Sequence, residues 1–242
     1  MTAGLAAGDD VGVHRDLMPE LPLSGARTAA YRHAVGHDRT APRPAIIFDC
    51  DGVLNQEPGG DGVLKPEDVV LLPGAGEAVK AARDAGFLAV MITNRAQVAR
   101  GLVSFAELDR IFCRIKLLLG ECGGVIDAIY FCPHHPEPHD RGKIAELSIR
   151  CECRKPGALL FRRAIAALPI DIARSAVIGD SLRDIGAARA VGIAAYGVRT
   201  GYGCGDVERF PGGAAPAPDR IFAHVGEAVD FCMSHLAPAP RS

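Results

Sequence analysis

Several short stretches of this chain bring acidic, basic, hydroxyl and thiol side chains together at spacings that suit chemistry. They are Asp49-Cys-Asp51, Thr93-Asn94, Cys132-Pro-His134, Cys151-Glu-Cys-Arg-Lys155 and Gly179-Asp-Ser-Leu-Arg-Asp184. All of these except the fourth come directly after an apolar run or at its end. In an open parallel sheet, ligands bind beyond the carboxyl ends of the strands. These stretches are therefore the first candidates for a functional site.

Asp49 and Asp51 lie two residues apart after the apolar run 45–48. The period of two in a strand points both carboxylates the same way, and nearby carboxylates repel unless a cation lies between them. Oxygen ligands favour a hard divalent ion, so we predict a Mg2+ site, with Asp180 as a third carboxylate. The plainer alternatives are solvated acids in a turn, a helix N-cap for Asp180 and a first-turn acid for Asp184.

Thr93 and Asn94 end a second apolar run with a hydroxyl, an amide and backbone N–H groups, which suit phosphate oxygens. Lys155 adds a compact positive charge for the same phosphate, and the fork of Arg154 can hold a second anionic or hydroxyl group. The alternatives are a strand-end turn for the first pair and a solvated helix start for the second.

Three cysteines and a histidine occur as two closely spaced pairs: Cys132, His134, Cys151 and Cys153. Three thiolates and an imidazole suit a closed tetrahedral Zn2+ site. The second pair leads directly into Arg154 and Lys155, so we expect a structural zinc that orients these two cations. The alternatives are free buried cysteines, or a ligand role for His135 or His139.

Apolar runs alternate with amphipathic segments from residue 45 onward. Strands are expected at 45–48, 87–93, 126–131, 175–179 and 193–198, and a last strand and helix within 220–236. Helices are expected at about 73–86, 104–120, 157–168 and 182–192. This alternation predicts an α/β fold, a Rossmann-like open parallel sheet with helices on both faces.

One folded domain is expected at 41–236. Residues 1–40 are rich in Ala and Gly and show no helix or strand period, so they are predicted to be a disordered extension, and 237–242 a flexible tail. The chain between the first two strands has room for a loop and one helix only. We therefore predict a capless domain in which a zinc-binding loop insertion helps to wall the pocket.

Composition limits the classes of partner. The 242 residues have a formal net charge of -2, and the pI is near 6.4, which gives no sign of a nucleic-acid-binding surface. No apolar run is long enough for a transmembrane helix, and no secretory signal is indicated. We expect a cytoplasmic protein with a small-molecule substrate, no nucleic-acid or membrane partner, and a monomeric state.

The strings IIFDCDGVLN, ITN, CPHHP, CECRKP and GDSLRDI, in this order, resemble the haloacid dehalogenase superfamily. More narrowly, they are similar to its branch of heptose-bisphosphate and histidinol-phosphate phosphatases. The resemblance runs from about residue 44 to 203, and the joint occurrence of these motifs is specific. It also agrees with the zinc loop, which the heptose branch has at this place.

The resemblance implies a role for each matching position. Asp49 would be the nucleophile and Asp51 the general acid and base. Mg2+ would be held by Asp49, the backbone carbonyl of Asp51 and Asp180. The catalytic set is completed by two residues at the transferred phosphoryl group, Thr93 and Lys155. The expected substrate-binding residues are Asn55, Asn94, Arg95 and Arg154.

The function that the resemblance implies is Mg2+-dependent removal of the 7-phosphate from D-glycero-D-manno-heptose 1,7-bisphosphate through an aspartyl-phosphate. This reaction would serve nucleotide-activated heptose biosynthesis. One alternative is a phosphatase for histidinol phosphate or another small sugar phosphate. Another, from a different class, is a catalytically inactive binding module stabilised by zinc.

Overall fold

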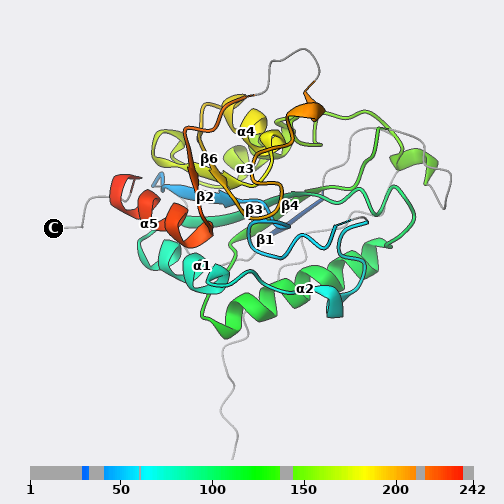
Figure 1. Cartoon of the computed structure of the whole chain (residues 1–242), viewed down its shortest axis with the longest axis horizontal. Helices are drawn as coiled ribbons and strands as arrows, with labels where there is room; N and C mark the ends of the chain where they lie inside the picture. Colours follow the sequence, from blue (N-terminus) through cyan, green and yellow to red (C-terminus); the bar gives the residue numbers. More distant parts are fainter. Residues whose placement is uncertain (1–28, 33–40, 60, 137–143, 211–215, 237–242) are drawn as a thin grey trace, which may run out of the picture.

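The computed structural model describes residues 29–32, 41–59, 61–136, 144–210 and 216–236 (Figure 1). The strands are β1 (Ala29–Arg32), β2 (Ala45–Phe48), β3 (Leu88–Asn94), β4 (Ala128–Cys132), β5 (Ala176–Gly179), β6 (Ala194–Val198) and β7 (Arg220–Phe222). The α-helices are α1 (Ala75–Asp84), α2 (Phe105–Glu121), α3 (Leu159–Ala167), α4 (Leu182–Arg189) and α5 (Val225–Leu236). Short 3-10 helices are η1 (Pro66–Asp68), η2 (Ala145–Leu147), η3 (Ile172–Arg174) and η4 (Val207–Arg209).

The strands form one sheet in the order β1-β4-β3-β2-β5-β6-β7. All neighbouring pairs from β4 to β7 are parallel, and β1 joins β4 antiparallel at the edge. The predicted parallel α/β sheet is confirmed. Within residues 1–40, which the sequence predicts to be a disordered extension, the structure describes one strand, β1. The other residues of that extension, and the predicted tail, lie outside the described residues.

Helices cover both faces of the sheet, as predicted (Figure 1). Side chains alternate along each buried strand, so Ile46 and Phe48 pack in the core beneath α1, α2 and α5, whereas Ile47 packs with the residues of α3 and α4. Burial on both faces explains why these strands have apolar runs rather than an alternating pattern.

Two helix starts show how short polar motifs fix the elements. Ser104 Oγ accepts a hydrogen bond from Glu107 N at 3.2 Å, and the Glu107 carboxylate accepts one from Ser104 N at 2.7 Å, which together form a capping box at the start of α2. Ser181 and Asp184 make the same exchange at the start of α4. Asp180 therefore precedes the cap of α4, and its carboxylate is available for another role.

The carboxyl ends of the central strands lie side by side because β4, β3, β2 and β5 are neighbours in the sheet. Between β2 and α1, the described residues contain η1 but no strand or α-helix, in agreement with the capless prediction. Among the helices that the structure describes, none has the length and apolar character needed to cross a membrane.

Candidate active site

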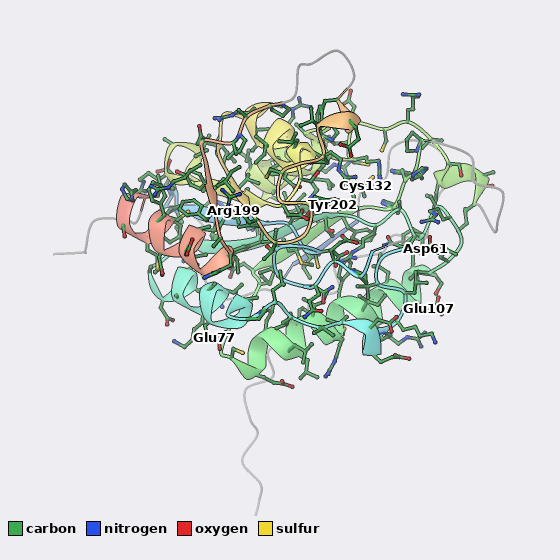
Figure 2. All side chains as sticks on the ribbon, in the orientation of Figure 1. Asp61, Glu77, Glu107, Cys132, Arg199 and Tyr202 are labelled. Atoms are coloured by element: carbon green, nitrogen blue, oxygen red, sulfur yellow. The ribbon has the colours of Figure 1, made fainter. Side chains whose placement is uncertain are left out.

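A cavity of about 300 Å3 lies beyond the carboxyl ends of β2, β3 and β5. Most of the predicted site residues line it: Asp49, Asp51, Thr93, Asn94, Arg154, Lys155 and Asp180. Asp61 and Tyr202, which are labelled in Figure 2, also line this cavity. The fold thus brings chemistry-bearing stretches from distant parts of the sequence together in one place.

Lys155 is a buried cation of this cavity. Its Nζ lies 2.8 Å from Asp49 Oδ1 and 2.6 Å from Asp184 Oδ1, and it donates a hydrogen bond to the Ile92 carbonyl at 2.7 Å. Asn94 holds its backbone, accepting from Lys155 N at 3.0 Å and donating to Lys155 O at 3.2 Å. Burial acts to lower the pKa of Lys155, but the carboxylates of Asp184 and Asp49 raise it, so the ammonium stays charged.

Three carboxylates form an acidic cluster in the cavity. Asp49, Asp180 and Asp184 each offer an oxygen within 4.8 Å of the others. Burial raises the pKa of Asp180 to about 8 and that of Asp184 to about 6, and the charge of Asp49 adds to both shifts. Ionisation of all three carboxylates is unfavourable unless a cation lies between them, so the cluster fits a hard divalent ion such as Mg2+.

The sequence predicts Asp49, Asp51 and Asp180 as the metal ligands, whereas the cluster contains Asp184 in place of the Asp51 side chain. Asp184, for which the sequence suggests a first-turn acid, caps α4 and also belongs to the cluster. The side chain of Asp51 lies outside it, in agreement with a contribution through the backbone carbonyl only.

Two glycines form a close cradle around the Asp180 carboxylate. Gly52 (φ +83°) and Gly201 (φ +59°) come from separate loops, and a Cβ on either would lie 2.1 or 2.0 Å from Asp180 Oδ2. The same oxygen accepts a hydrogen bond from Tyr202 N at 2.8 Å. Only glycine combines these backbone angles with this approach, so the cradle fixes the Asp180 carboxylate against the cavity.

Asp51 is held by two residues that the sequence predicts as substrate ligands. Arg95 Nη1 donates to Asp51 Oδ2 at 2.6 Å, and Asn55 Nδ2 donates to Asp51 Oδ1 at 3.0 Å. Arg95 is 1% exposed and Asn55 is 0% exposed, and neither lines the cavity. In the structure the donors of both side chains engage the carboxylate of Asp51, whereas the sequence predicts that they contact the substrate.

The four predicted zinc ligands converge, with ligand atoms within 4.8 Å of one another. The sulfur atoms of Cys132, Cys151 and Cys153 are separated by 3.2 to 3.6 Å, and His134 Nδ1 lies 3.1 Å from Cys153 Sγ. A disulfide would need about 2.05 Å, whereas a tetrahedron with metal–sulfur bonds of about 2.3 Å has edges of roughly 3.8 Å. Burial raises the pKa of the Cys132 thiol. Three thiols and an imidazole gathered at these distances are a donor set that suits a bound dication.

The cysteine cluster is coupled to the cavity through the residues that follow it. Arg154 Nη1 donates to the carbonyl of His134 at 3.4 Å, and Lys155 is held by Asn94 as described above. His135 lines the cavity and is not in the cluster, and His139 lies outside the described residues.

Comparison with known proteins gives the family. A HAD-hydrolase-like family model matches residues 152–228. The D-glycero-D-manno-heptose-1,7-bisphosphate 7-phosphatase of Thermosynechococcus vestitus is 35% identical over 201 residues, which cover 81% of this chain and 99% of that protein. The chain belongs to the haloacid dehalogenase (HAD) phosphatases.

A further relative and a solved structure support this assignment. The D-glycero-beta-D-manno-heptose-1,7-bisphosphate 7-phosphatase of Bordetella bronchiseptica is 38% identical over 159 residues, covering 65% of this chain and 82% of that protein. A solved structure of the D,D-heptose 1,7-bisphosphate phosphatase from B. bronchiseptica, complexed with magnesium and phosphate, has a TM-score of 0.68 and 32% identity. The alignment covers 79% of this chain and 98% of that one.

Some residues of the HAD cavity were missed by sequence reasoning, notably Tyr202 and Arg183. Tyr202 lies in the loop after β6 and lines the cavity. The Cζ atom of Arg183 lies 5.7 Å from the centre of the Tyr202 ring. Both had a usable signal. Arg183 is inside the GDSLRD motif, and residues 199–206 follow a strand whose carboxyl end faces the same side as the others.

Proposed function

We propose that this HAD phosphatase removes the 7-phosphate of D-glycero-D-manno-heptose 1,7-bisphosphate in nucleotide-activated heptose biosynthesis. The names of its relatives support the substrate, and this chain aligns with nearly the whole length of those relatives. The cavity without a cap domain suits a phosphate at the end of a small, extended sugar. Arg154 lines this cavity beside Lys155, and a guanidinium at this place can hold a distal phosphate or hydroxyl groups.

The observation that carries the chemistry is the contact of Lys155 Nζ with Asp49 Oδ1 at 2.8 Å. Asp49 lines the cavity at a strand end, where its carboxylate can reach a phosphorus atom. In the proposed step, an Asp49 oxygen attacks phosphorus, the bond to the sugar oxygen breaks, and an aspartyl-phosphate forms. Lys155 and the hydroxyl of Thr93 stabilise the charge on the transferred phosphoryl oxygens.

Asp51 moves the protons of the proposed reaction. Its carboxyl group donates a proton to the departing sugar oxygen as the aspartyl-phosphate forms. The resulting carboxylate then takes a proton from the water that attacks the aspartyl-phosphate, so that Asp49 and inorganic phosphate are released. The proton balance closes over one turnover, and no nucleotide cofactor is required.

Two metal ions belong to the proposal. Mg2+, held by Asp49, Asp180 and the backbone carbonyl of Asp51, would neutralise charge on the phosphoryl oxygens. Asp184 adjoins this set and orients Lys155. Zn2+, held by the cluster of three cysteines and His134, is structural and fixes the loop that carries Arg154 and Lys155.

The proposal also covers the domain boundaries, the oligomeric state and the cellular compartment. We assign the catalytic domain to 41–236 together with β1, and we expect a monomer, which light scattering after size exclusion would test. All eight cysteines are free, and three of them form a metal-type cluster with His134, which suits a reducing compartment such as the cytoplasm.

Parallel assays test the proposed substrate. Purified protein with Mg2+ is given D-glycero-D-manno-heptose 1,7-bisphosphate or histidinol phosphate, and 31P NMR locates the phosphate that remains. We expect a higher kcat/KM for the bisphosphate and loss of the 7-phosphate only, because the cationic amine of histidinol phosphate meets the guanidinium of Arg154. Preference for histidinol phosphate, or release of the 1-phosphate, would contradict the proposal.

A further inference from the structure

The side chain of Arg95 is buried against Asp51 rather than directed at the cavity. Nη1 donates to Asp51 Oδ2 at 2.6 Å, and Nη2 lies 3.4 Å from Asp51 Oδ1 and 2.9 Å from Cys50 Sγ. The guanidinium also lies 5.6 Å from the ring centre of Phe112. This two-pronged contact fixes the plane of the carboxylate as well as its position, which a single-point cation cannot do.

Asn55 restrains the same carboxylate from another direction. Its Oδ1 accepts a hydrogen bond from Val70 N at 2.8 Å, and because a backbone N–H can only donate, the orientation of the amide is set. Asn55 Nδ2 therefore faces Asp51 Oδ1, at 3.0 Å, and also the Gln56 carbonyl, at 2.7 Å. Both oxygens of Asp51 thus have a fixed donor.

The burial of Arg95 carries a cost that this contact offsets. The side chain is 1% exposed, and within the described residues its Nε has no hydrogen-bond partner. Its backbone N–H is tied to the Cys132 carbonyl at 2.7 Å, at the end of β4. Burying a guanidinium with an unsatisfied nitrogen is energetically costly, and the ion pair with Asp51 offsets part of that cost.

We infer that Arg95 is a positioning residue, which together with Asn55 holds the Asp51 carboxylate in the orientation needed for proton transfer to the leaving oxygen. The inference rests on the proposed role of Asp51. It replaces a direct role of Arg95 in substrate binding with an action through a neighbouring side chain. Removal of Arg95 should therefore lower kcat/KM for substrates whose leaving group needs a proton. It should leave kcat/KM nearly unchanged for substrates whose leaving group does not.

The test compares kcat/KM for two substrates, because this parameter reports the steps up to formation of the aspartyl-phosphate only. One is a sugar phosphate, whose alkoxide needs a proton, and the other is p-nitrophenyl phosphate, whose phenolate leaves without one. For Arg95→Met we expect a fall of roughly a hundredfold with the sugar phosphate and less than about threefold with p-nitrophenyl phosphate. Arg95→Lys restores part of the loss. Equal losses on both substrates would overturn the inference.

A double-mutant cycle with Asp51 separates positioning from folding. In an Asp51→Asn background, Arg95→Met should change kcat/KM for the sugar phosphate by less than about threefold, because its target is already absent. The matched control is Arg83→Gln, which breaks a largely buried ion pair to Asp127, 3.0 Å long and remote from the cavity. It should lower thermal stability without separating the two substrates. Additive effects of Arg95→Met and Asp51→Asn would refute positioning.

Asn55→Ala covers the case in which Arg95→Met does not fold. This variant should show the same selective loss with the sugar phosphate, and the inference fails if it does not. Wild-type assays keep the two proposals apart. If the wild type hydrolyses other sugar phosphates but not heptose 1,7-bisphosphate, the proposed substrate is wrong, and the same comparison is made with the sugar phosphate that it accepts.

Discussion

The ammonium of Lys155 lies 2.6 Å from Oδ1 of Asp184, and both side chains are almost fully buried. The other oxygen of Asp184 accepts a hydrogen bond from Ser181 N at 3.2 Å, so the start of α4 fixes this carboxylate. Lys155 is therefore aligned from one side by Asp184 and meets Asp49 on the other, at 2.8 Å. The cap of a helix thus sets the position of a cation in the cavity.

Asp184→Asn should lower kcat by roughly a hundredfold, because the ammonium that stabilises the phosphoryl oxygens loses its alignment. The apparent affinity for Mg2+ should fall about tenfold or more, as is typical when a residue beside the metal ligands is changed. Stability without Mg2+ should change little, because loss of the ion pair is offset by relief of carboxylate repulsion. Steady-state assays over a Mg2+ titration, with thermal melts, measure all three effects. An unchanged kcat would contradict this role.

Asp49→Asn should abolish turnover, with a loss on the order of 10^4-fold or more, because the amide cannot attack phosphorus. Asp51→Asn should be severely impaired through loss of the proton donor. Far-UV circular dichroism should show an intact fold for both variants. Phosphate release by Asp49→Asn above background would refute the aspartyl-phosphate mechanism.

Mg2+ should stabilise the protein more strongly at high pH. The folded-state pKa values of Asp180 and Asp184 are raised to about 8 and about 6 from 3.8, by burial and then by the charge of Asp49. Without metal, the stability that these groups contribute is present below the unfolded pKa and is lost as pH rises through 6 and then 8. Bound Mg2+ keeps the carboxylates ionised and removes that loss.

The measurement is the change in Tm on adding Mg2+, at about pH 5.5 and about pH 8.5. Mg2+ is removed by dialysis, since a strong chelator would also strip zinc. Asp180→Asn is the control variant and should lose most of the difference between the two pH values. A Mg2+ increment that is equal at both pH values would show that these carboxylates do not hold the ion.

Cys153→Ser should lower zinc content and phosphatase activity together. Cys153 Sγ lies 3.1 to 3.3 Å from three other donors of the cluster, and the next two residues are Arg154 and Lys155. We expect activity to fall by roughly a hundredfold or more as Lys155 loses its place. Cys113→Ser, at an exposed cysteine of α2, is the control and should leave both unchanged. Elemental analysis that finds no stoichiometric zinc in the wild type would refute the site.

The sequence predicted the sheet and the place of the site well because both depend on local patterns. Apolar runs such as 45–48 and 175–179 mark strands buried on both faces, and the residues after them lie at one edge of the sheet by topology. The spacing of the cysteines likewise predicts that these residues converge with His134, as the structure shows.

The contacts that could not be predicted from the sequence depend on packing between distant segments. Asn55 and Arg95 have side chains suited to a phosphate, and only the folded loops show that their donors meet Asp51 instead. The strand β1 carries no apolar run, since an edge strand can be added through backbone hydrogen bonds alone. Tyr202 lies in the loop after β6 and belongs to none of the motifs from which the site was predicted.

Two truncations of the N-terminus should show which part of the extension contributes to activity and stability. Deleting 1–28 keeps β1, and activity should stay within about threefold of the full chain. Deleting 1–40 removes the strand that pairs with β4 from Ala29↔Phe131 to Arg32↔Ala128, and leaves the edge of β4 unpaired. We expect a Tm lower by several degrees, since about 1 kcal/mol shifts Tm by roughly 2–4 °C at this size. We also expect more aggregation through the open edge of β4.

Because β4 ends at Cys132, zinc content should also fall in the longer deletion. Thermal melts, light scattering and metal analysis of the two truncations test this, and equal behaviour of both would show that β1 contributes nothing to the domain.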